Sequence, residues 1–481
     1  MAHRFNPIHR VVLAVGAVLQ RFGLVDHDRT AEAAELSWPR IVTGIARMSK
    51  NAVDVAMVGV ALGSLAIAGV GFASPFWGLA FSLGGGIAAG SIALVSQRFG
   101  ADAYDDIGAP IRHSVTLVLV GTVPLTLFFA AVPETLIGFL TDDPTVLAYG
   151  SDYLRVVAFG IPFAALNLIG SRVYIGVDDA WTPMVLRATG AIVNIGLNAV
   201  FIFGLDMGVV GAALGTVLSN AVITVAFFVG LTVRRIPGTR PFPAPVSVRG
   251  RYTDRETLSD LVSIGLPVIG RNSVWTVARF PMLAIVGLFG PTVVAAYVIA
   301  RRIWGLLNTP GWGFGLAASS LVGQELGADD EDTAAAYGRE ITLLAIGTYA
   351  IGGVLTALFA ERIVRLFVDS SADPSIPVAV GLVYVACVAV IPQAVKATVA
   401  GALDATGDTR WPFYSQVLGM FVVGLPLAYL GATTALGIWG LYLSFFAEAA
   451  IPAVINYYRF TTGKWRAISR EYRPNAAKAD D

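Results

Sequence analysis

Cysteine and charged residues are scarce in this sequence of 481 residues. Cys387 is the only cysteine, so no disulfide can form within the chain and no thiolate metal cluster can be assembled. Charged residues make up 14% of the chain and hydrophobic residues 56%, whereas a soluble domain carries about a quarter charged residues. A chain of this composition cannot cover a water-exposed surface, so lipid must be its solvent over much of its length.

Histidine and net charge are equally limited. The 33 basic and 33 acidic residues balance, so the overall charge does not indicate a nucleic-acid partner. The four histidines lie outside the strongest apolar runs or at the edge of one, which argues against a histidine metal site: His3, His9, His27 and His113. The apolar runs hold no His/Cys/Asp cluster, Ser–His pair or phosphate-binding loop. The sequence therefore predicts neither a cofactor nor an enzyme, although an integral-membrane enzyme is the alternative from another functional class.

Long apolar runs dominate what is present. A run of about 20 apolar residues is long enough to span a membrane as a helix. We predict twelve such helices, at residues 36–60, 64–97, 110–132, 150–175, 184–205, 208–233, 260–289, 292–323, 338–360, 377–402, 411–431 and 436–458. The chain is thus expected to be an all-α integral membrane protein.

Basic residues gather in three segments, which sets the expected orientation. They are Arg4, Arg10 and Arg21 near the start, Arg234, Arg235, Arg240, Arg249, Arg251 and Arg255 midway, and Arg459, Lys464, Arg466, Arg470 and Arg473 at the end. With twelve spans all three segments fall on one side, and the positive-inside rule places that side in the cytoplasm. We therefore expect a multi-pass protein of the plasma membrane with both termini cytoplasmic. The short apolar stretch Val11–Leu19 is interpreted as an interfacial helix, since no clean signal-peptide cleavage site follows it.

The two halves of the sequence repeat at offsets of 227 to 230 residues. Gly100-Ala101-Asp102 after the second run matches Gly327-Ala328-Asp329 after the eighth, and Pro39 matches Pro267. Six spans in each half give both copies the same orientation, which predicts two related lobes with a site between them. The expected organisation is an N-terminal segment 1–35, an N-terminal lobe 36–233, a cytoplasmic linker 234–259, a C-terminal lobe 260–459 and a cytoplasmic tail 460–481.

Three groups of motifs point to a known family. They are Asp54 with Met57-Val58-Gly59 and Ala68-Gly69-Val70-Gly71; Asn194-Ile195-Gly196-Leu197-Asn198 with Phe201-Ile202-Phe203-Gly204 and Gly208-Val209-Val210-Gly211; and Gly401-Ala402-Leu403-Asp404-Ala405-Thr406-Gly407-Asp408-Thr409. From about residue 36 to 460, their order and spacing resemble the multidrug and toxic compound extrusion (MATE) transporters of the multidrug/oligosaccharidyl-lipid/polysaccharide flippase superfamily. The resemblance implies twelve helices in two V-shaped lobes, and export of organic compounds driven by inward flow of Na⁺ or H⁺.

Asp54 is the leading candidate for the coupling site. It lies inside the first predicted span, where an ionisable side chain is costly and usually functional. The resemblance implies that an aspartate here binds the coupling cation or proton. Asn194, Asn198 and Thr216 supply hard oxygens that suit Na⁺ or can hydrogen-bond a protonated Asp54, although helix–helix packing is the competing interpretation. Lys50 lies one helical turn before Asp54 and is a candidate internal counter-ion.

Several other residues are weaker candidates. Asn167, Tyr174, Trp275, Gln393 and Lys396 are expected to line a substrate cavity. In the C-terminal half, Trp275 and Gln393 align with acidic positions of another branch of the family, so a second ion site is not expected there. Pro39 is expected to bend the first span, with a switch coupled to protonation as a further interpretation.

The sequence therefore predicts a secondary active multidrug efflux transporter that works by alternating access as an antiporter. It leaves Na⁺ and H⁺ as alternative coupling ions, and it leaves the substrate open. A cationic small molecule is favoured, although Lys396 and the arginines of the C-terminal half leave room for an anionic one. A flippase or exporter of a lipid-linked or polysaccharide precursor is the alternative function. Membrane lipid is the surrounding partner, and a monomer is expected because two lobes complete the transporter.

Overall fold

The computed structural model describes residues 6–247, 249–368 and 373–473, and every regular element in these ranges is helical. His3, Arg4 and the tail beyond residue 473 lie outside the described residues. Within the described ranges, ten helical stretches are long and apolar enough to cross a membrane. The first and the eighth predicted spans are not among these ten. The first corresponds to α2 (His27–Leu62), which carries more charged residues. The eighth is divided between α12 (Pro291–Leu307) and α13 (Thr309–Gly327). The expected all-helical membrane fold is confirmed.

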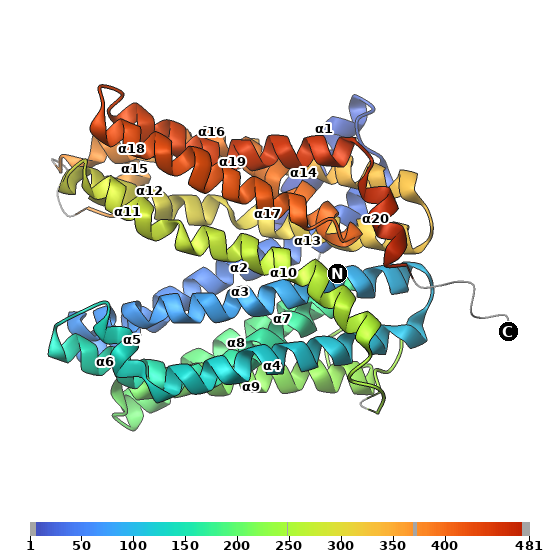
Figure 1. The fold of residues 1–481 in the computed structure, drawn as a ribbon, viewed down its shortest axis with the longest axis horizontal. Coiled ribbons are helices and arrows are strands. Elements are labelled where there is room, and N and C mark those ends of the chain that lie inside the picture. Colours follow the sequence, from blue (N-terminus) through green and yellow to red (C-terminus); the bar gives the residue numbers. More distant parts are fainter. Residues whose placement is uncertain (1–5, 248, 369–372, 474–481) are drawn as a thin grey trace. The chain divides into compact units, whose positions relative to one another are not determined.

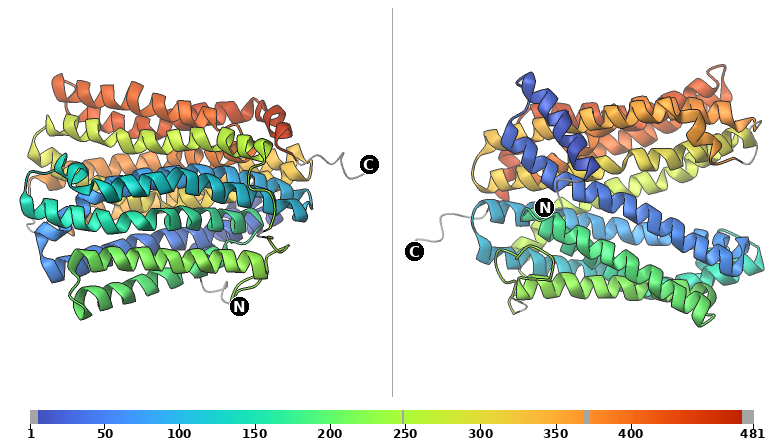
Figure 2. Two further views of the ribbon diagram at one scale, coloured as in Figure 1. Left: turned by 60° about the horizontal axis from the view of Figure 1, so that its bottom comes forward. Right: turned by 180° about the vertical axis from the view of Figure 1, so that it is seen from behind.

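The helices form two compact units (Figures 1 and 2). The N-unit comprises residues 42–269 and the C-unit comprises residues 6–41 together with 270–473. The N-unit contains the second part of α2, then α3 (Ser64–Gly100), η2 (Tyr104–Ile107), α4 (Gly108–Ala131), α5 (Pro133–Gly138), α6 (Pro144–Val157), η3 (Ala158–Gly160), α7 (Ile161–Gly176), α8 (Trp181–Asn198), η4 (Ala199–Gly204), α9 (Gly208–Val233) and the first part of α10 (Arg255–Val277).

The C-unit begins with α1 and is centred on the long helix α16. Its remaining elements are α1 (Pro7–Arg21), the first part of α2, the end of α10, α11 (Arg279–Gly287), α12, α13, α14 (Glu331–Leu358), α15 (Ala360–Arg365), α16 (Ser375–Thr406), α17 (Arg410–Val417), η5 (Leu418–Gly424), α18 (Leu425–Thr433), α19 (Ile438–Thr461) and α20 (Trp465–Glu471). The short N-terminal apolar stretch forms α1, which buries Val12 and Val15 and packs against α14.

Two helices belong partly to each unit. Helix α2 passes from the C-unit to the N-unit after Ile41, and α10 passes from the N-unit to the C-unit after Ile269. Each change of unit falls two residues after a proline inside the helix, Pro39 in α2 and Pro267 in α10. Both helices continue through their prolines, although a proline removes one backbone hydrogen-bond donor and weakens the helix locally.

The backbone repeats between the two halves along with the sequence. Gly63 and Gly290 precede α3 and α12 with φ angles of 84° and 94°, and Asp102 and Asp329 follow α3 and α13 with φ angles of 56° and 64°. Aspartate enters this left-handed region more readily than most residues do, because its short side chain can hydrogen-bond to nearby backbone. Both halves therefore use the same residue type for the same turn.

Small residues allow the central helices to approach closely. Helix α16 packs against α13, α14 and α19 in the C-unit, as Figure 1 illustrates. A Cβ atom added at Gly401 of α16 would lie 2.0 Å from the carbonyl oxygen of Gly315 in α13. In the N-unit, a Cβ atom at Gly86 of α3 would lie 2.6 Å from the carbonyl oxygen of Gly265 in α10. Packing of this kind, rather than the hydrophobic effect, holds helices together in lipid.

Four arginines of the C-unit are each paired with a carboxylate. Arg29 pairs with Glu340, Arg271 with Asp404, Arg301 with Glu448 and Arg459 with Asp408, at 2.6 to 2.7 Å between nitrogen and oxygen. The Arg271 and Arg301 pairs each involve two hydrogen bonds. This pairing satisfies the guanidinium groups without water, which is what burial in a membrane protein requires.

We predict that Gly401→Ala destabilises the protein, because the added methyl group has no space against the α13 backbone. The cost should be about 1–3 kcal/mol, the usual range for overpacking. Thermal unfolding in detergent, followed by tryptophan fluorescence, should show a lower midpoint. Gly352→Ala is the matched control, since a Cβ atom there meets nothing within 4 Å and alanine favours the helix. Equal midpoints for the two variants would contradict this account of the packing.

Candidate functional site

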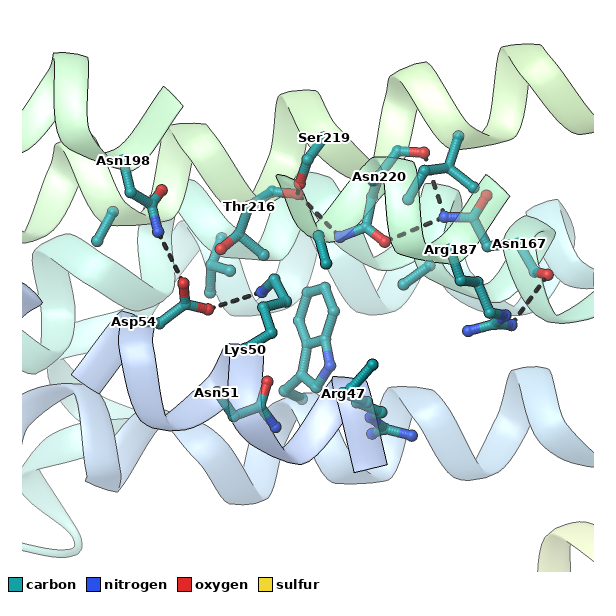
Figure 3. A pocket seen from close by; sticks show the side chains of 18 of the residues that line it. Arg47, Lys50, Asn51, Asp54, Asn167, Arg187, Asn198, Thr216, Ser219 and Asn220 are labelled. Atoms are coloured by element: carbon teal, nitrogen blue, oxygen red, sulfur yellow. Dashed lines mark hydrogen bonds and ion pairs between the residues drawn. The ribbon is translucent and has the colours of Figure 1, made fainter. Parts of the chain in front are cut away.

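The N-unit encloses a cavity of about 400 Å³ lined by residues of α2, α3, α6, α7, α8 and α9 (Figure 3). On α2, Arg47, Lys50 and Asp54 follow at spacings of three and four residues, which places them on one face of the helix. They line the cavity together with Asn198 of α8 and Thr216 of α9. Residues from five of the six N-unit spans thus meet around one polar space within the membrane-spanning part of the chain.

Asp54 has a partner on each of its carboxylate oxygens. The Lys50 Nζ atom lies 2.6 Å from Oδ2, and the Asn198 side chain donates a hydrogen bond to Oδ1 at 3.0 Å. The side chains of Asp54 and Lys50 are about one-fifth exposed. In this arrangement the charge of Asp54 is balanced by Lys50, so any cation that bound to this carboxylate would have to compete with that lysine.

The other predicted coupling residues extend this cluster. The Asn198 amide also contacts the Asn194 side-chain oxygen at 3.5 Å, and the Asn194 amide contacts Thr216 Oγ at 3.4 Å and Ser219 Oγ at 3.3 Å. Asn194 and Asn198 are almost fully buried. The structure therefore brings Asp54, Asn194, Asn198 and Thr216 into one connected set of polar groups.

Asn198 occupies a position that the local backbone constrains. It is the last residue of α8, and the chain then continues as the π-helical turn η4. Turns of this type recur at functional sites in helices. Its side-chain oxygen is buried and has no hydrogen-bond partner among the described residues. That oxygen faces Gly215 of α9, where an added Cβ atom would lie only 2.0 Å away.

This set of atoms fits a hard cation or a proton better than a transition metal. Carboxylate, amide and hydroxyl oxygens are the groups that coordinate Na⁺-like hard ions, and the carboxylate can instead accept a proton. The described residues contain no group of three or more His, Cys, Asp or Glu side chains that could hold a metal ion. The chemistry available here is the exchange of one positive charge at Asp54.

Of the residues expected in a substrate cavity, Asn167 lines the N-unit cavity and Tyr174 does not. Asn167 is buried and donates hydrogen bonds to the backbone and side-chain oxygens of Asn220. Tyr174 is 1% exposed and packs against Phe227 and Phe242 in the apolar core. The expectation for Tyr174 is therefore corrected: its ring fills the space between α7, α9 and the linker instead of facing the cavity.

The remaining cavity candidates lie in the C-unit, outside this cavity. The Gln393 amide donates a hydrogen bond to the side chain of Asn308, at the break between α12 and α13. Lys396 donates to the backbone oxygen of Glu448 at 3.4 Å. The Arg279 guanidinium stacks on the Trp275 ring, 3.6 Å from its centre. The role of Trp275, Gln393 and Lys396 in substrate binding stays a prediction.

Two arginines of the cavity escaped the sequence reasoning. Arg47 lies on α2 one turn before Lys50, and Arg187 lies on α8. Both fall within predicted spans, 36–60 and 184–205, and a charged residue in such a position is a functional candidate in its own right. The sequence contains both charged residues inside apolar runs, but the sequence-based prediction considered only Asp54 and its neighbour Lys50 among the charged residues of this half. Glu448, which neutralises Arg301 in α12, was missed in the same way.

Two sets of membrane-spanning helices related by an internal repeat, with a polar cavity in one of them, are an architecture found in membrane transporters. The MatE family model matches residues 39–200 and 267–430, once in each half of the chain. The protein belongs to the MatE family, the multidrug and toxic compound extrusion transporters. It is a multi-pass membrane protein of that family.

Named relatives span nearly the whole chain. The "Probable multidrug resistance protein YoeA" of Bacillus subtilis is 24% identical over 441 residues, covering 89% of this chain and 92% of the relative. The "Probable multidrug resistance protein NorM" of Rhodopseudomonas palustris is 28% identical over 470 residues, covering 93% and 95%. These proteins support a transporter, and not an enzyme, at the level of the family.

Solved structures share the fold. An outward-facing multidrug resistance MATE family transporter of the MOP superfamily matches with a TM-score of 0.84 at 22% identity, covering 93% of this chain and 98% of that protein. A MOP superfamily transporter from Pyrococcus furiosus, described as having a binding pocket of reverse polarity that suggests a different function, matches with a TM-score of 0.82 at 21% identity, covering 98% and 99%. At these identities the likeness establishes the fold alone.

We predict that Gly215→Ala impairs transport although it removes no polar group. The added methyl group would push the Asn198 side chain away from Asp54, which loses a hydrogen bond to a charged group worth about 1.5–3 kcal/mol. Ion-driven efflux from vesicles should fall roughly ten-fold or more. Gly196→Ala, in α8 between Asn194 and Asn198, is the control because a Cβ atom there meets nothing within 4 Å. Full activity in correctly folded Gly215→Ala protein would argue against the Asn198–Asp54 contact.

Proposed function

We propose that this protein is a secondary active exporter that couples outward movement of an organic compound to inward movement of Na⁺ or H⁺ at Asp54. The observation that carries the proposal is the position of Asp54 in a membrane-spanning unit, held by Lys50 and Asn198 beside further polar groups. The names of the relatives, which speak of multidrug resistance, support export of foreign compounds.

The contacts of Asp54 suggest how the ion acts. A cation entering from outside competes with Lys50 for the carboxylate, while Asn194, Asn198 and Thr216 supply neutral oxygens around it. A proton on Asp54 would have the same effect, because it removes the charge that holds Lys50. A ligand shifts a conformational equilibrium only if it binds the two states differently. Release of Lys50 from Asp54 supplies such a difference within the N-unit.

The charges of the cavity bear on the substrate. A cationic organic compound is the expectation from the sequence, yet Asp54 is the one acidic residue that lines the N-unit cavity and it is paired with Lys50. The same basic lining leaves export of a lipid-linked precursor, a phosphate-bearing compound, as the second candidate function. We further propose that the chain works as a monomer in the plasma membrane with both termini in the cytoplasm, surrounded by lipid and without a nucleic-acid partner.

We predict that Asp54→Asn abolishes ion-driven export. Purified protein in lipid vesicles would be given a Na⁺ gradient or a pH gradient separately, and efflux of a cationic and an anionic fluorescent dye would be followed. Efflux in the wild type under one gradient identifies the coupling ion, and its loss in Asp54→Asn assigns coupling to this carboxylate. Gln324→Ala, a polar substitution in the C-unit away from the cavity, should keep full activity. Normal coupled efflux by Asp54→Asn would remove Asp54 from the mechanism.

We predict that Lys50→Ala lowers the concentration of coupling cation that gives half-maximal transport. The substitution removes the internal cation that competes for Asp54, so roughly ten-fold less Na⁺ or H⁺ should suffice, equivalent to about 1.4 kcal/mol. The measurement is efflux as a function of Na⁺ concentration and of pH. A cation dependence identical to that of the wild type would mean that Lys50 is only a structural partner of Asp54.

A further inference from the structure

Arg47 and Arg187 are positive charges in the N-unit cavity that no carboxylate of the described residues neutralises. The Arg47 guanidinium lies over the Phe81 ring, 4.6 Å from its centre, and forms no ion pair with any residue that the structure describes. Arg187 donates one hydrogen bond, to the backbone oxygen of Asn167 at 3.3 Å, and its buried Nε atom has no partner within the described ranges. Figure 3 shows both guanidinium groups in the same part of the cavity, away from Asp54.

The surroundings add to this positive charge. Arg187 lies near enough to Arg47 and Arg172 to be repelled by both. The cavity is lined by three basic residues and one acidic residue, and that acid, Asp54, is engaged by Lys50 and Asn198. Asp54 therefore does not serve as the counter-ion of either cavity arginine.

The C-unit shows that this chain can neutralise arginines when the fold alone requires it. Arg271 and Arg301 lie in membrane-spanning helices, as Arg47 and Arg187 do, and each forms two hydrogen bonds with a carboxylate. A guanidinium group remains charged in proteins, so loss of a proton cannot relieve the cost of burial. The unpaired arginines of the N-unit thus retain donors and charge for a partner from outside the chain.

We propose that the N-unit cavity binds an anionic group of the transported compound, a carboxylate or a phosphate, between Arg47 and Arg187. The planar guanidinium donors match the paired oxygens of such groups. Trp77 and Phe81 line the same cavity and provide an apolar surface for the rest of the molecule. This inference rests on the proposed export function and specifies its substrate class: organic anions with an apolar body.

The test compares two dyes of one ring system but opposite charge, carboxyfluorescein and rhodamine 6G, on the full chain in nanodiscs. Fluorescence polarisation should show tighter binding of the anionic dye. The double variant Arg47→Gln/Arg187→Gln should weaken carboxyfluorescein binding roughly ten-fold or more, because two charge-assisted contacts are lost. The variant Arg47→Lys/Arg187→Lys keeps the charge and should recover part of the affinity. Arg155→Gln, at a surface arginine that pairs with Glu134, is the matched control and should bind normally.

Two outcomes would overturn the proposal. One is carboxyfluorescein binding that is the same in wild type and in the folded Arg47→Gln/Arg187→Gln protein. The other is preferential binding of rhodamine 6G that these substitutions leave unchanged or strengthen. If the glutamine variant does not fold, the lysine variant decides. Binding between charges weakens as salt is added, so carboxyfluorescein binding by the lysine variant that salt does not weaken would contradict a charge-based site.

A second pair of assays separates a soluble anion from a lipid headgroup as the source of the anionic group. Vesicles would contain either trapped carboxyfluorescein or NBD-labelled phosphatidylglycerol, with NBD-labelled phosphatidylcholine as the lipid control. Arginine-dependent efflux of the dye assigns a soluble substrate, and arginine-dependent movement of phosphatidylglycerol between leaflets assigns a lipid. Arginine-dependent binding without movement under any ion gradient would keep the anion site and reject coupled export. Coupled export of rhodamine 6G alone, unaffected by the arginine variants, would keep coupled export and reject the anion site.

Discussion

A charge inside a membrane-spanning helix is costly unless a partner matches it, and this cost organises the polar interior of both units. The C-unit meets it with ion pairs between helices, such as Arg301 of α12 with Glu448 of α19. The N-unit meets it at Asp54 with a lysine of the same helix and an amide from α8. A pair within one helix can be opened without moving one helix against another, whereas an interhelical pair resists such movement. In the function proposed above, the N-unit pair can therefore open during transport, whereas the C-unit pairs hold neighbouring helices together.

Close packing of small residues sets how far the polar groups can move. The Asn198 amide is confined by Gly215, and the helices around it approach through glycine and alanine. Because a packed interior has no space for gradual deformation, loss of the Asn198–Asp54 hydrogen bond would be a discrete event. The π-helical turn that follows Asn198 adds a local irregularity at the point where α8 can adjust.

The sequence was sufficient to predict the helices and the family, and part of the candidate site. Run length and hydropathy placed most spanning helices within a few residues of their observed bounds, since the apolar solvent leaves few alternatives to a helix, although α2 and α14 begin well before the predicted starts at residues 36 and 338. The Lys50–Asp54 spacing could be interpreted because both residues share a helix. The contact between Asp54 and Asn198 joins residues 144 positions apart, which no local pattern encodes. The prediction for Tyr174 was wrong because no local pattern shows whether a tyrosine in an apolar run packs into the core or faces a cavity.

The internal repeat separates what the fold needs from what a function needs. Matching turns such as Asp102 and Asp329 recur in both halves because both halves need the same backbone path. The position about one repeat after Asp54 holds Met282, which is buried in the C-unit. A six-helix unit can therefore be built with an apolar side chain at this position, and stability of the helix bundle does not require a carboxylate there. Arg47 and Arg187 also differ from Arg271 and Arg301 of the C-unit, because those two arginines are each paired with a carboxylate. Within the described part of the chain, the fold neither repeats nor neutralises Arg47 and Arg187, yet it places both around one cavity. A ligand is the missing partner of such residues.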